Sequence, residues 1–156
     1  MSIQSRSHQR NKMLLYLADA IRGAAASLNA AEHLICKEAG LSVEQWRGLS
    51  AIGRTTRFLS VSQLARVLNH SRQSTYELVL GLERAGWIRL LRNPDDRRLL
   101  QMEIAPAGRR TLSIVDARRS EWLVTMTYDL GESDLYTLTD RTRALRNRIT
   151  RARTYT

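Results

Sequence analysis

The segment 71–76 carries the side chains best suited to contacting a nucleic-acid duplex. Arg72 can donate two hydrogen bonds to guanine O6 and N7, and Gln73 can make the equivalent pair with adenine. Tyr76 can reach a phosphate or a thymine methyl group. With Ser71 and Ser74, these side chains are expected in the first turns of a helix, where a recognition helix approaches base edges. The alternative is an ordinary solvated helix start, with Ser71 only as its cap.

A second charged cluster follows in a turn-forming stretch, where Arg97 and Arg98 come directly after Asp95 and Asp96. Arginine side chains enter narrow minor grooves, and a neighbouring carboxylate can hold the guanidinium in place. We therefore expect an arginine of this turn to reach the minor groove. The alternative is a plain turn with surface ion pairs, which are worth only about 0–1 kcal/mol each.

Capping signals predict two short helices that would position the first cluster. Ser60 and Gln63 have the spacing of a capping box just before an apolar run, and a tight connection is expected at Asn69. Ser71 then caps a second helix, which ends at Gly86. Two short helices joined in this way form a helix-turn-helix candidate. The full set of candidate DNA contacts is Ser60, Ser62, Ser71, Arg72, Gln73, Ser74, Tyr76, Arg92, Arg97 and Arg98.

A β-hairpin is expected after this pair of helices. Residues 87–91 and 99–104 are β-prone runs, and residues 93–96 between them form a turn cluster. A helix-turn-helix followed by a hairpin is the winged-helix arrangement. In it the second helix enters the major groove, and the hairpin tip reaches a neighbouring groove or the backbone.

Longer helices are expected on both sides of this central part. Apolar periodicity predicts a first helix over 13–36, and a capping box at Ser42 opens a second that ends near residue 53. After the hairpin, a fifth helix over 106–131 and a sixth over 132–153 are expected. The fold class is therefore mainly α with a small β-hairpin wing. The end helices expose more apolar surface than so small a domain can cover, so we expect them to pair with a second copy. The alternative is that they fold back on their own domain.

The composition indicates a polyanionic partner. The chain has 156 residues and a net charge of +10, and only Lys12 and Lys37 of its 25 basic residues are lysine. Guanidinium groups suit phosphates and base edges, but composition alone does not distinguish DNA from RNA or an anionic membrane. Residues 1–10 lack the apolar core of a leader, and no stretch has the roughly 20 apolar residues of a membrane span. We therefore expect a cytoplasmic protein without a membrane partner. No phosphate loop, nucleophile elbow or HExxH motif is found, so an enzyme is not expected.

Several motifs, in a fixed order, resemble one known family. They are Leu41-Ser42-Val43-Glu44-Gln45-Trp46, Ser62-Gln63-Leu64-Ala65, Leu82-Glu83-Arg84-Ala85-Gly86-Trp87-Ile88, Asn93-Pro94-Asp95-Asp96-Arg97-Arg98 and Ile104-Ala105-Pro106-Ala107-Gly108. Over about residues 14–149, the sequence resembles the multiple-antibiotic-resistance regulator (MarR) family of winged-helix transcription factors.

The resemblance implies one domain over residues 1–156. Its winged helix-turn-helix part would cover 41–105, and dimerisation helices would cover 10–38 and 106–153. It also implies a homodimer on a pseudo-palindromic operator in double-stranded DNA, usually released by a small ligand. By position, Asp96 looks like the brace of the wing and Arg98 like its minor-groove residue.

A ligand pocket is expected between the first, second and fifth helices. Its lining would be Leu17, Ile21, Trp46, Leu49 and Val115, a mostly apolar set that suits an aromatic acid. The alternative is that these residues are simply core, because any core needs such a stripe.

The single cysteine, Cys36, excludes a disulfide framework within one chain. We expect it to be a buried structural residue. His33, one helical turn earlier, could lower its pKa, which leaves a peroxide-sensing thiol as the alternative. Glu32, His33 and Cys36 supply too few ligands for a closed zinc site, so neither a metal nor another cofactor is expected.

The function that follows is a sequence-specific, DNA-binding transcriptional regulator. We expect a homodimeric repressor that a small aromatic or phenolic effector releases from its operator. The alternative is a non-specific architectural nucleic-acid-binding protein, in which the charge of +10 matters and the recognition helix reads no sequence.

Overall fold

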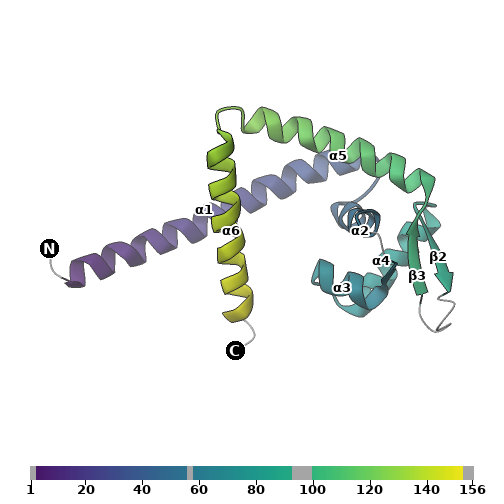
Figure 1. Ribbon diagram of the computed structural model, residues 1–156, viewed down its shortest axis with the longest axis horizontal. Helices are drawn as coiled ribbons and strands as arrows, with labels where there is room; N and C mark the ends of the chain where they lie inside the picture. Colours follow the sequence, from purple (N-terminus) through teal and green to yellow (C-terminus); the bar gives the residue numbers. More distant parts are fainter. Residues whose placement is uncertain (1–2, 56–57, 93–99, 153–156) are drawn as a thin grey trace. The chain divides into compact units, whose positions relative to one another are not determined.

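The computed structural model describes residues 3–55, 58–92 and 100–152. The chain divides into two compact units, Met1–Arg119 and Ser120–Thr156, and each is described by itself. Figure 1 labels the helices and the strands β2 and β3. The helices are α1 (Ile3–Glu38), α2 (Val43–Gly53), α3 (Val61–Leu68), α4 (Arg72–Arg84), α5 (Pro106–Met126) and α6 (Glu132–Ala152). The strands are β1 (Leu59–Ser60), β2 (Ile88–Arg92) and β3 (Leu100–Ile104).

Capping boxes begin α2 and α3, as the sequence predicts. The Gln45 backbone N–H donates to Ser42 Oγ at 3.1 Å, and the Ser42 N–H donates to Gln45 Oε1 at 2.8 Å. Ser60 and Gln63 repeat this arrangement at 3.3 and 2.8 Å. Each box satisfies two backbone N–H groups that a helix start otherwise leaves unpaired, so these two starts are fixed by local sequence.

The predicted helix-turn-helix is confirmed, and a single residue makes its turn. Asn69 ends α3 in the left-handed conformation, with φ of 57°. Asparagine tolerates this conformation better than most residues, because its short side chain can hydrogen-bond locally. Ser71 then caps α4, where its Oγ accepts the Ser74 backbone N–H at 3.0 Å. The chain therefore reverses within a few residues and places α4 directly after α3.

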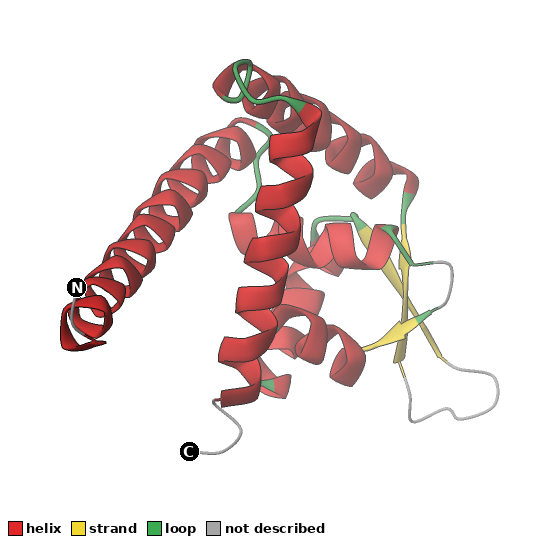
Figure 2. Cartoon of the chain, turned by 60° about the vertical axis from the view of Figure 1, so that its left-hand side comes forward, coloured by secondary structure: helices red, strands yellow, loops and turns green. Residues whose placement is uncertain are grey.

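The wing is part of a three-stranded antiparallel sheet in the order β1-β3-β2, drawn in yellow in Figure 2. β2 and β3 pair from Ile88 opposite Ile104 to Arg92 opposite Leu100, which confirms the predicted hairpin. β1, which pairs Leu59 with Met102, is not predicted from the sequence. A strand of 2 residues is too short to show the alternation by which strands are recognised.

The core of the winged-helix part is built from one face of each of its elements. Leu49 of α2, Leu64 of α3, and Val79 and Leu82 of α4 are fully buried, and Met102 of β3 packs among them. Burying an aliphatic side chain of this size stabilises a fold by about 1.5–3 kcal/mol. The inner face of α4 is therefore fixed by packing. A second, smaller cluster consists of Cys36, Leu41, Trp46 and Val115.

The start of α5 is held against the chain just before β2. The Ala105 N–H donates to the Trp87 carbonyl oxygen at 2.9 Å. A Cβ at Gly108 would lie 2.1 Å from that same oxygen, a distance that no side chain tolerates. Glycine is therefore required at this position, because the helix backbone approaches the Trp87 backbone too closely for any other residue.

The long helices differ in extent from their predictions. α1 begins at Ile3, well before residue 13, and exposes Leu14, Leu17 and Ile21 on its surface. α5 ends at Met126, short of residue 131, because the chain turns there with the Leu130 N–H bonded to the Thr127 carbonyl. No residue of α6 is buried along its described length. In the described part of the chain, no helix combines the length and the apolar character needed to cross a membrane.

Candidate nucleic-acid interface

The starts of α3, α4 and β3 surround one hollow of about 520 Å³. All its lining residues except Val61 and Leu100 are candidate contacts from the sequence, although those candidates lie in two separate stretches of the chain. The hollow is lined by Ser60, Val61, Ser62, Arg72, Gln73, Tyr76 and Leu100. Sequence reasoning missed Val61 and Leu100, because an apolar side chain gives no hydrogen-bonding signal.

The two faces of α4 have different roles. Thr75 and Val79 are fully buried, and Thr75 Oγ1 donates to the backbone carbonyl of the cap residue at 2.8 Å. Arg72, Gln73 and Tyr76 are exposed, with Tyr76 retaining 43% of its accessible surface. Because the buried face fixes how the helix is rotated, the opposite face presents these three side chains together.

Ser71 and Ser74 lie beside this hollow and do not line it. They border a separate depression of about 310 Å³ with Glu44, His70 and Leu78. The two serine hydroxyl oxygens are 2.9 Å apart, and Ser71 Oγ also accepts the Ser74 N–H. Their hydroxyls are therefore engaged in starting α4, so the capping role of Ser71 is present whatever else it contacts.

Gln73 is held by its neighbour one turn along α4. Its amide nitrogen donates to Glu77 Oε1 at 3.5 Å, and both side chains are exposed. In this arrangement Glu77 engages one N–H of the Gln73 amide, and the second N–H and the carbonyl oxygen can still meet a base edge. The paired contact with adenine needs one N–H and the oxygen of the amide, so Gln73 can keep its bond to Glu77 while making it.

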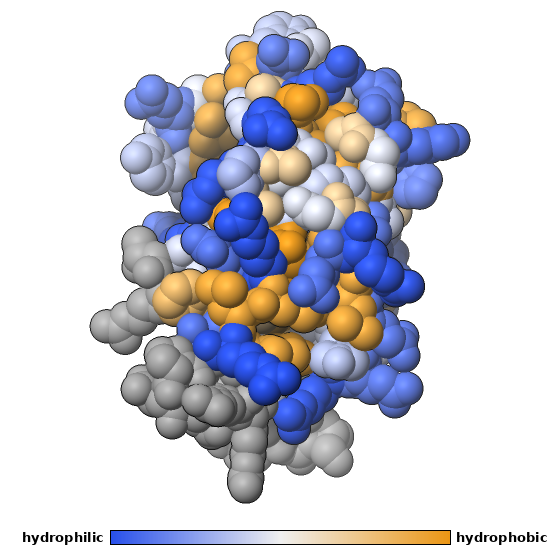
Figure 3. Space-filling view, turned by 90° about the vertical axis from the view of Figure 1, so that its right-hand side faces the viewer, coloured by the Kyte–Doolittle hydropathy of each residue, from blue (hydrophilic) through white to orange (hydrophobic). Residues whose placement is uncertain are grey.

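The described end of the wing lies close to the hollow. Arg92, the last residue of β2, is exposed and pairs with Leu100, which lines the hollow. Asp96, Arg97 and Arg98 fall outside the described residues, so the wing brace and the minor-groove arginine stay predictions. Figure 3 views the molecule from the side on which β2 and β3 lie in Figure 1. On that face a band of hydrophobic side chains runs between hydrophilic ones.

A second cavity, of about 750 Å³, lies in the first unit, and it differs from the predicted pocket. Of the predicted lining, only Trp46 borders it. Leu49 and Val115 are buried in the two core clusters, whereas Leu17 and Ile21 are exposed on α1. Periodicity identifies apolar faces correctly but does not show that α1 exposes Leu17 and Ile21 away from this cavity. The residues lining the cavity are Leu28, Glu32, Trp46, Arg47, Ser50, Ala51, Arg54, Thr55, Leu59, Val67, Leu68 and Arg119.

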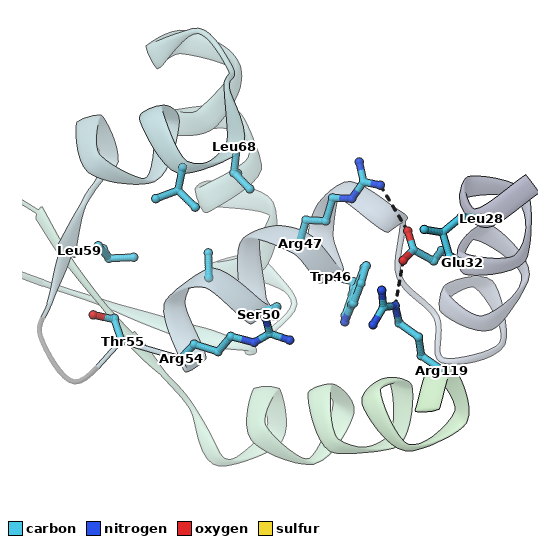
Figure 4. Close-up of a pocket in the computed structure, with 12 residues that line it drawn as sticks. Leu28, Glu32, Trp46, Arg47, Ser50, Arg54, Thr55, Leu59, Leu68 and Arg119 are labelled. Carbon is cyan, nitrogen blue, oxygen red and sulfur yellow. Dashed lines mark hydrogen bonds and ion pairs between the residues drawn. The ribbon is translucent and has the colours of Figure 1, made fainter. Parts of the chain in front are cut away.

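Charged residues that the sequence analysis did not assign to a pocket gather at one end of this cavity (Figure 4). Glu32 is only 3% exposed. Its carboxylate accepts hydrogen bonds from Arg119 Nε at 2.8 Å and from Arg47 Nη2 at 3.3 Å. The Arg119 guanidinium also lies 5.2 Å from the centre of the Trp46 ring. The only sequence signal for this cluster is a glutamate on the inward stripe of α1, between Leu28 and Cys36.

The surroundings of Cys36 oppose reactivity. The side chain is 1% exposed, and its burial, followed by the Glu32 carboxylate, raises the pKa of the thiol above its ordinary value. Arg47 and Arg119 oppose this shift of the pKa, whereas His33 is not among its causes. A reactive thiol needs a lowered pKa and access to solvent. The structure therefore favours a buried, structural role for Cys36 over a peroxide-sensing one. Within the described ranges, no group of three or more His, Cys, Asp and Glu residues is placed to hold a metal ion.

Comparisons with known proteins agree with this fold. Residues 39–99 match the family model described as the MarR family, and a search of curated proteins finds no match. The chain is similar to a solved MarR family transcription regulator, with a TM-score of 0.84 and 20% identity, covering 97% of this chain and 99% of that one.

Two further solved structures were determined with bound molecules. CouR from Rhodococcus jostii, bound to p-coumaroyl-CoA, has a TM-score of 0.74 and 16% identity, covering 83% of this chain and 90% of that one. A mutant of S. aureus MepR, bound to an oligodeoxyribonucleotide, has a TM-score of 0.61 and 14% identity, covering 85% and 97%. The matched segment holds the helix-turn-helix and β2, and the fold agrees along nearly the whole chain. Residues 39–99 thus resemble the MarR family, and the chain has the winged helix-turn-helix fold of solved MarR family transcription regulators.

Proposed function

We propose that this protein is a sequence-specific, DNA-binding transcriptional repressor that acts as a homodimer and is released from its operator by a small effector. The observation that carries the proposal is the hollow where Arg72, Gln73 and Tyr76 meet Ser60 and Ser62. Its side chains have the reach and the donor and acceptor types needed to read base edges. The α4 face behind them is packed in the core, so the reading face is rigid.

The dimer is supported by apolar side chains exposed near both ends of the chain. Leu14 and Leu17 of α1 keep 53% and 47% of their surface accessible, and Leu138 and Ile149 of α6 keep 53% and 54%. Clustered apolar residues left exposed on long helices are typical of interfaces between copies. A two-fold dimer would place two α4 helices about 34 Å apart, which is one turn of duplex DNA.

The effector would enter the cavity of about 750 Å³ in the first unit. Trp46, Leu59 and Leu68 provide apolar walls, and Arg47 and Arg119 provide donors at one end, so an aromatic acid fits its chemistry. The similarity to CouR, solved with p-coumaroyl-CoA, also supports a small-molecule effector. An effector of this kind weakens operator binding only if it binds the DNA-free conformation more tightly.

Selection of bound fragments from a random pool of DNA duplexes, followed by competition with random DNA at physiological salt, tests the proposal. A sequence-specific regulator should keep a preference of about a thousandfold or more for its selected site. The net charge of +10 favours the second candidate, a non-specific architectural protein, which would show no such preference. Selection that yields no common sequence would therefore reject the regulator in favour of that candidate.

Arg72→Ala provides the matched test of the reading face. We expect it to cost about 1–3 kcal/mol on the selected site and to relax the preference at one base pair. Arg84→Ala is the control, because Arg84 is exposed at the opposite end of α4 and its Nε donates to the Leu80 carbonyl of the same helix. An Arg72→Ala protein that binds every site as the native protein does would contradict the assignment.

A further inference from the structure

Glu32 occupies a position where an acidic residue is costly. It lies on the inward stripe of α1 with Leu28 and Cys36, and only 3% of it is exposed. Removing a carboxylate from water costs several kcal/mol unless cations and hydrogen bonds compensate. The residue therefore needs partners in the fold, and its partners come from two other helices.

Each oxygen of the Glu32 carboxylate accepts a hydrogen bond from a different arginine. Arg119 of α5 donates through Nε to Oε1 at 2.8 Å, and Arg47 of α2 donates through Nη2 to Oε2 at 3.3 Å. Arg47 also donates to Asn29 Oδ1 at 2.7 Å, and Arg119 lies over the face of Trp46 at 5.2 Å. Figure 4 shows the two guanidinium groups approaching Glu32 from opposite sides at the end of the cavity.

The charges lining the cavity do not balance. Arg47, Arg54 and Arg119 line it together with one carboxylate, that of Glu32. The remaining residues of the lining are apolar or neutral, and the Trp46 ring forms a flat wall. A planar aromatic molecule with one carboxylate would match both the ring and the surplus of positive charge.

We propose that Glu32 is an internal competitor for the ligand of this cavity, a carboxylate that holds the arginine pair until an aromatic carboxylate takes its place. This inference rests on the proposed effector site and adds the residue with which its ligand must compete. An arriving carboxylate competes with Glu32 for the guanidinium groups of Arg47 and Arg119. A neutral molecule of the same shape gains nothing from the exchange, so the arginine pair selects for anions.

The same exchange links binding to the position of α1. Glu32 ties α1 to both α2 and α5 through its two arginines. A buried carboxylate that loses these partners must move to water or take up a proton, because it is too costly to leave charged and unpaired, and we expect the movement. Moving it displaces the part of α1 that carries it, and this gives the effector different affinities for two conformations of the protein.

Titration calorimetry with 2-naphthoate and its neutral isostere 2-naphthamide tests the inference on the full-length chain. In Glu32→Gln the competing charge is gone, so the Kd for 2-naphthoate should fall by about tenfold or more. The Kd for 2-naphthamide should change by less than about twofold. The matched control is Glu38→Gln, because Glu38 is also on α1 and pairs with Arg118, but its carboxylate is largely exposed and does not line the cavity.

The outcomes separate the inference from the function on which it rests. If 2-naphthoate binds the native chain and Glu32→Gln leaves its Kd unchanged or raises it, Glu32 does not compete and the inference is wrong. If no chain binds 2-naphthoate while all still bind the selected DNA, the effector site fails with the inference and the DNA-binding function stands.

Should Glu32→Gln not fold, Arg47→Gln decides, because Arg47 is half exposed. It must raise the Kd for 2-naphthoate about tenfold without affecting 2-naphthamide, and an unchanged Kd rejects the inference.

Discussion

The indole nitrogen of Trp46 donates a hydrogen bond to Asp116 Oδ1 at 3.1 Å, which joins α2 to α5 across 70 positions of sequence. Trp46 is 6% exposed, so water screens this bond little. The same ring packs in the cluster with Cys36 and Val115 and forms a wall of the larger cavity. Trp46 therefore connects the fold of the first unit with the site proposed for the effector.

Trp46→Phe should destabilise the protein by about 1–3 kcal/mol, because it leaves the Asp116 carboxylate without this donor and removes part of a buried ring. Urea unfolding followed by circular dichroism measures the loss. Trp122→Phe is the comparison, since Trp122 is only half buried. A loss at Trp46 no larger than the loss at Trp122 would show that the bond to Asp116 contributes nothing measurable.

Two glycines in helices should respond in opposite directions to alanine. At Gly108 a Cβ would meet the Trp87 carbonyl oxygen at 2.1 Å, whereas at Gly81 it would meet nothing within 4 Å. Gly108→Ala should therefore destabilise the fold by about 1–3 kcal/mol or more, since the start of α5 must move away from the Trp87 backbone. Gly81→Ala should stabilise it by about 0.5–1 kcal/mol, because glycine loses more backbone entropy than alanine in a helix.

Thermal unfolding of the two alanine variants beside the native chain measures both effects in one experiment. The pair is internally controlled, because the same chemical change is made at both positions. A rise in Tm for Gly108→Ala, or a fall for Gly81→Ala, would contradict the packing described at that position.

Local chemistry determines much of this fold, so the sequence predicts it well. The capping boxes at Ser42 and Ser60, the turn at Asn69 and the stop at Gly86 each depend on residues within one turn of each other. Most residues that line the hollow at the start of α4 could also be predicted from the sequence. Its candidate residues are polar and exposed, and the helix-turn-helix brings their two short stretches together.

The residues that line the second cavity could not be predicted from the sequence in this way. Glu32, Arg47 and Arg119 lie on three helices, and each alone resembles an ordinary surface charge. Their meeting depends on how α1 and α5 pack around α2, which no local pattern encodes. For the same reason periodicity assigned Leu17 and Val115 to one pocket, although the first is exposed and the second is in the core.

Arg92 should contribute to DNA affinity without contributing to sequence preference. It is exposed at the end of β2 and pairs with a residue that lines the hollow, so we expect its guanidinium to contact a phosphate. Arg92→Ala should weaken binding to selected and random duplexes alike and lower the slope of log K against log salt by about one. Fluorescence anisotropy over a salt series measures this slope. A loss confined to the selected site would instead assign Arg92 to base recognition.

The stability of the protein should depend on pH through Cys36. Burial raises the pKa of this thiol in the folded chain, whereas the unfolded chain has the ordinary value of about 8.5. Between the two pKa values the unfolded chain has lost the proton and the folded chain keeps it, so stability falls as pH rises above about 8.5. Cys36→Ala should be less stable than the native chain at pH 7.5, because it leaves a cavity, but it lacks this titration. The difference in free energy of unfolding between the two proteins should therefore narrow between about pH 7.5 and pH 10, since every other titrating group is common to both. Urea unfolding at the two pH values measures it, and a difference that stays constant would show that the thiol titrates alike in the folded and unfolded chains.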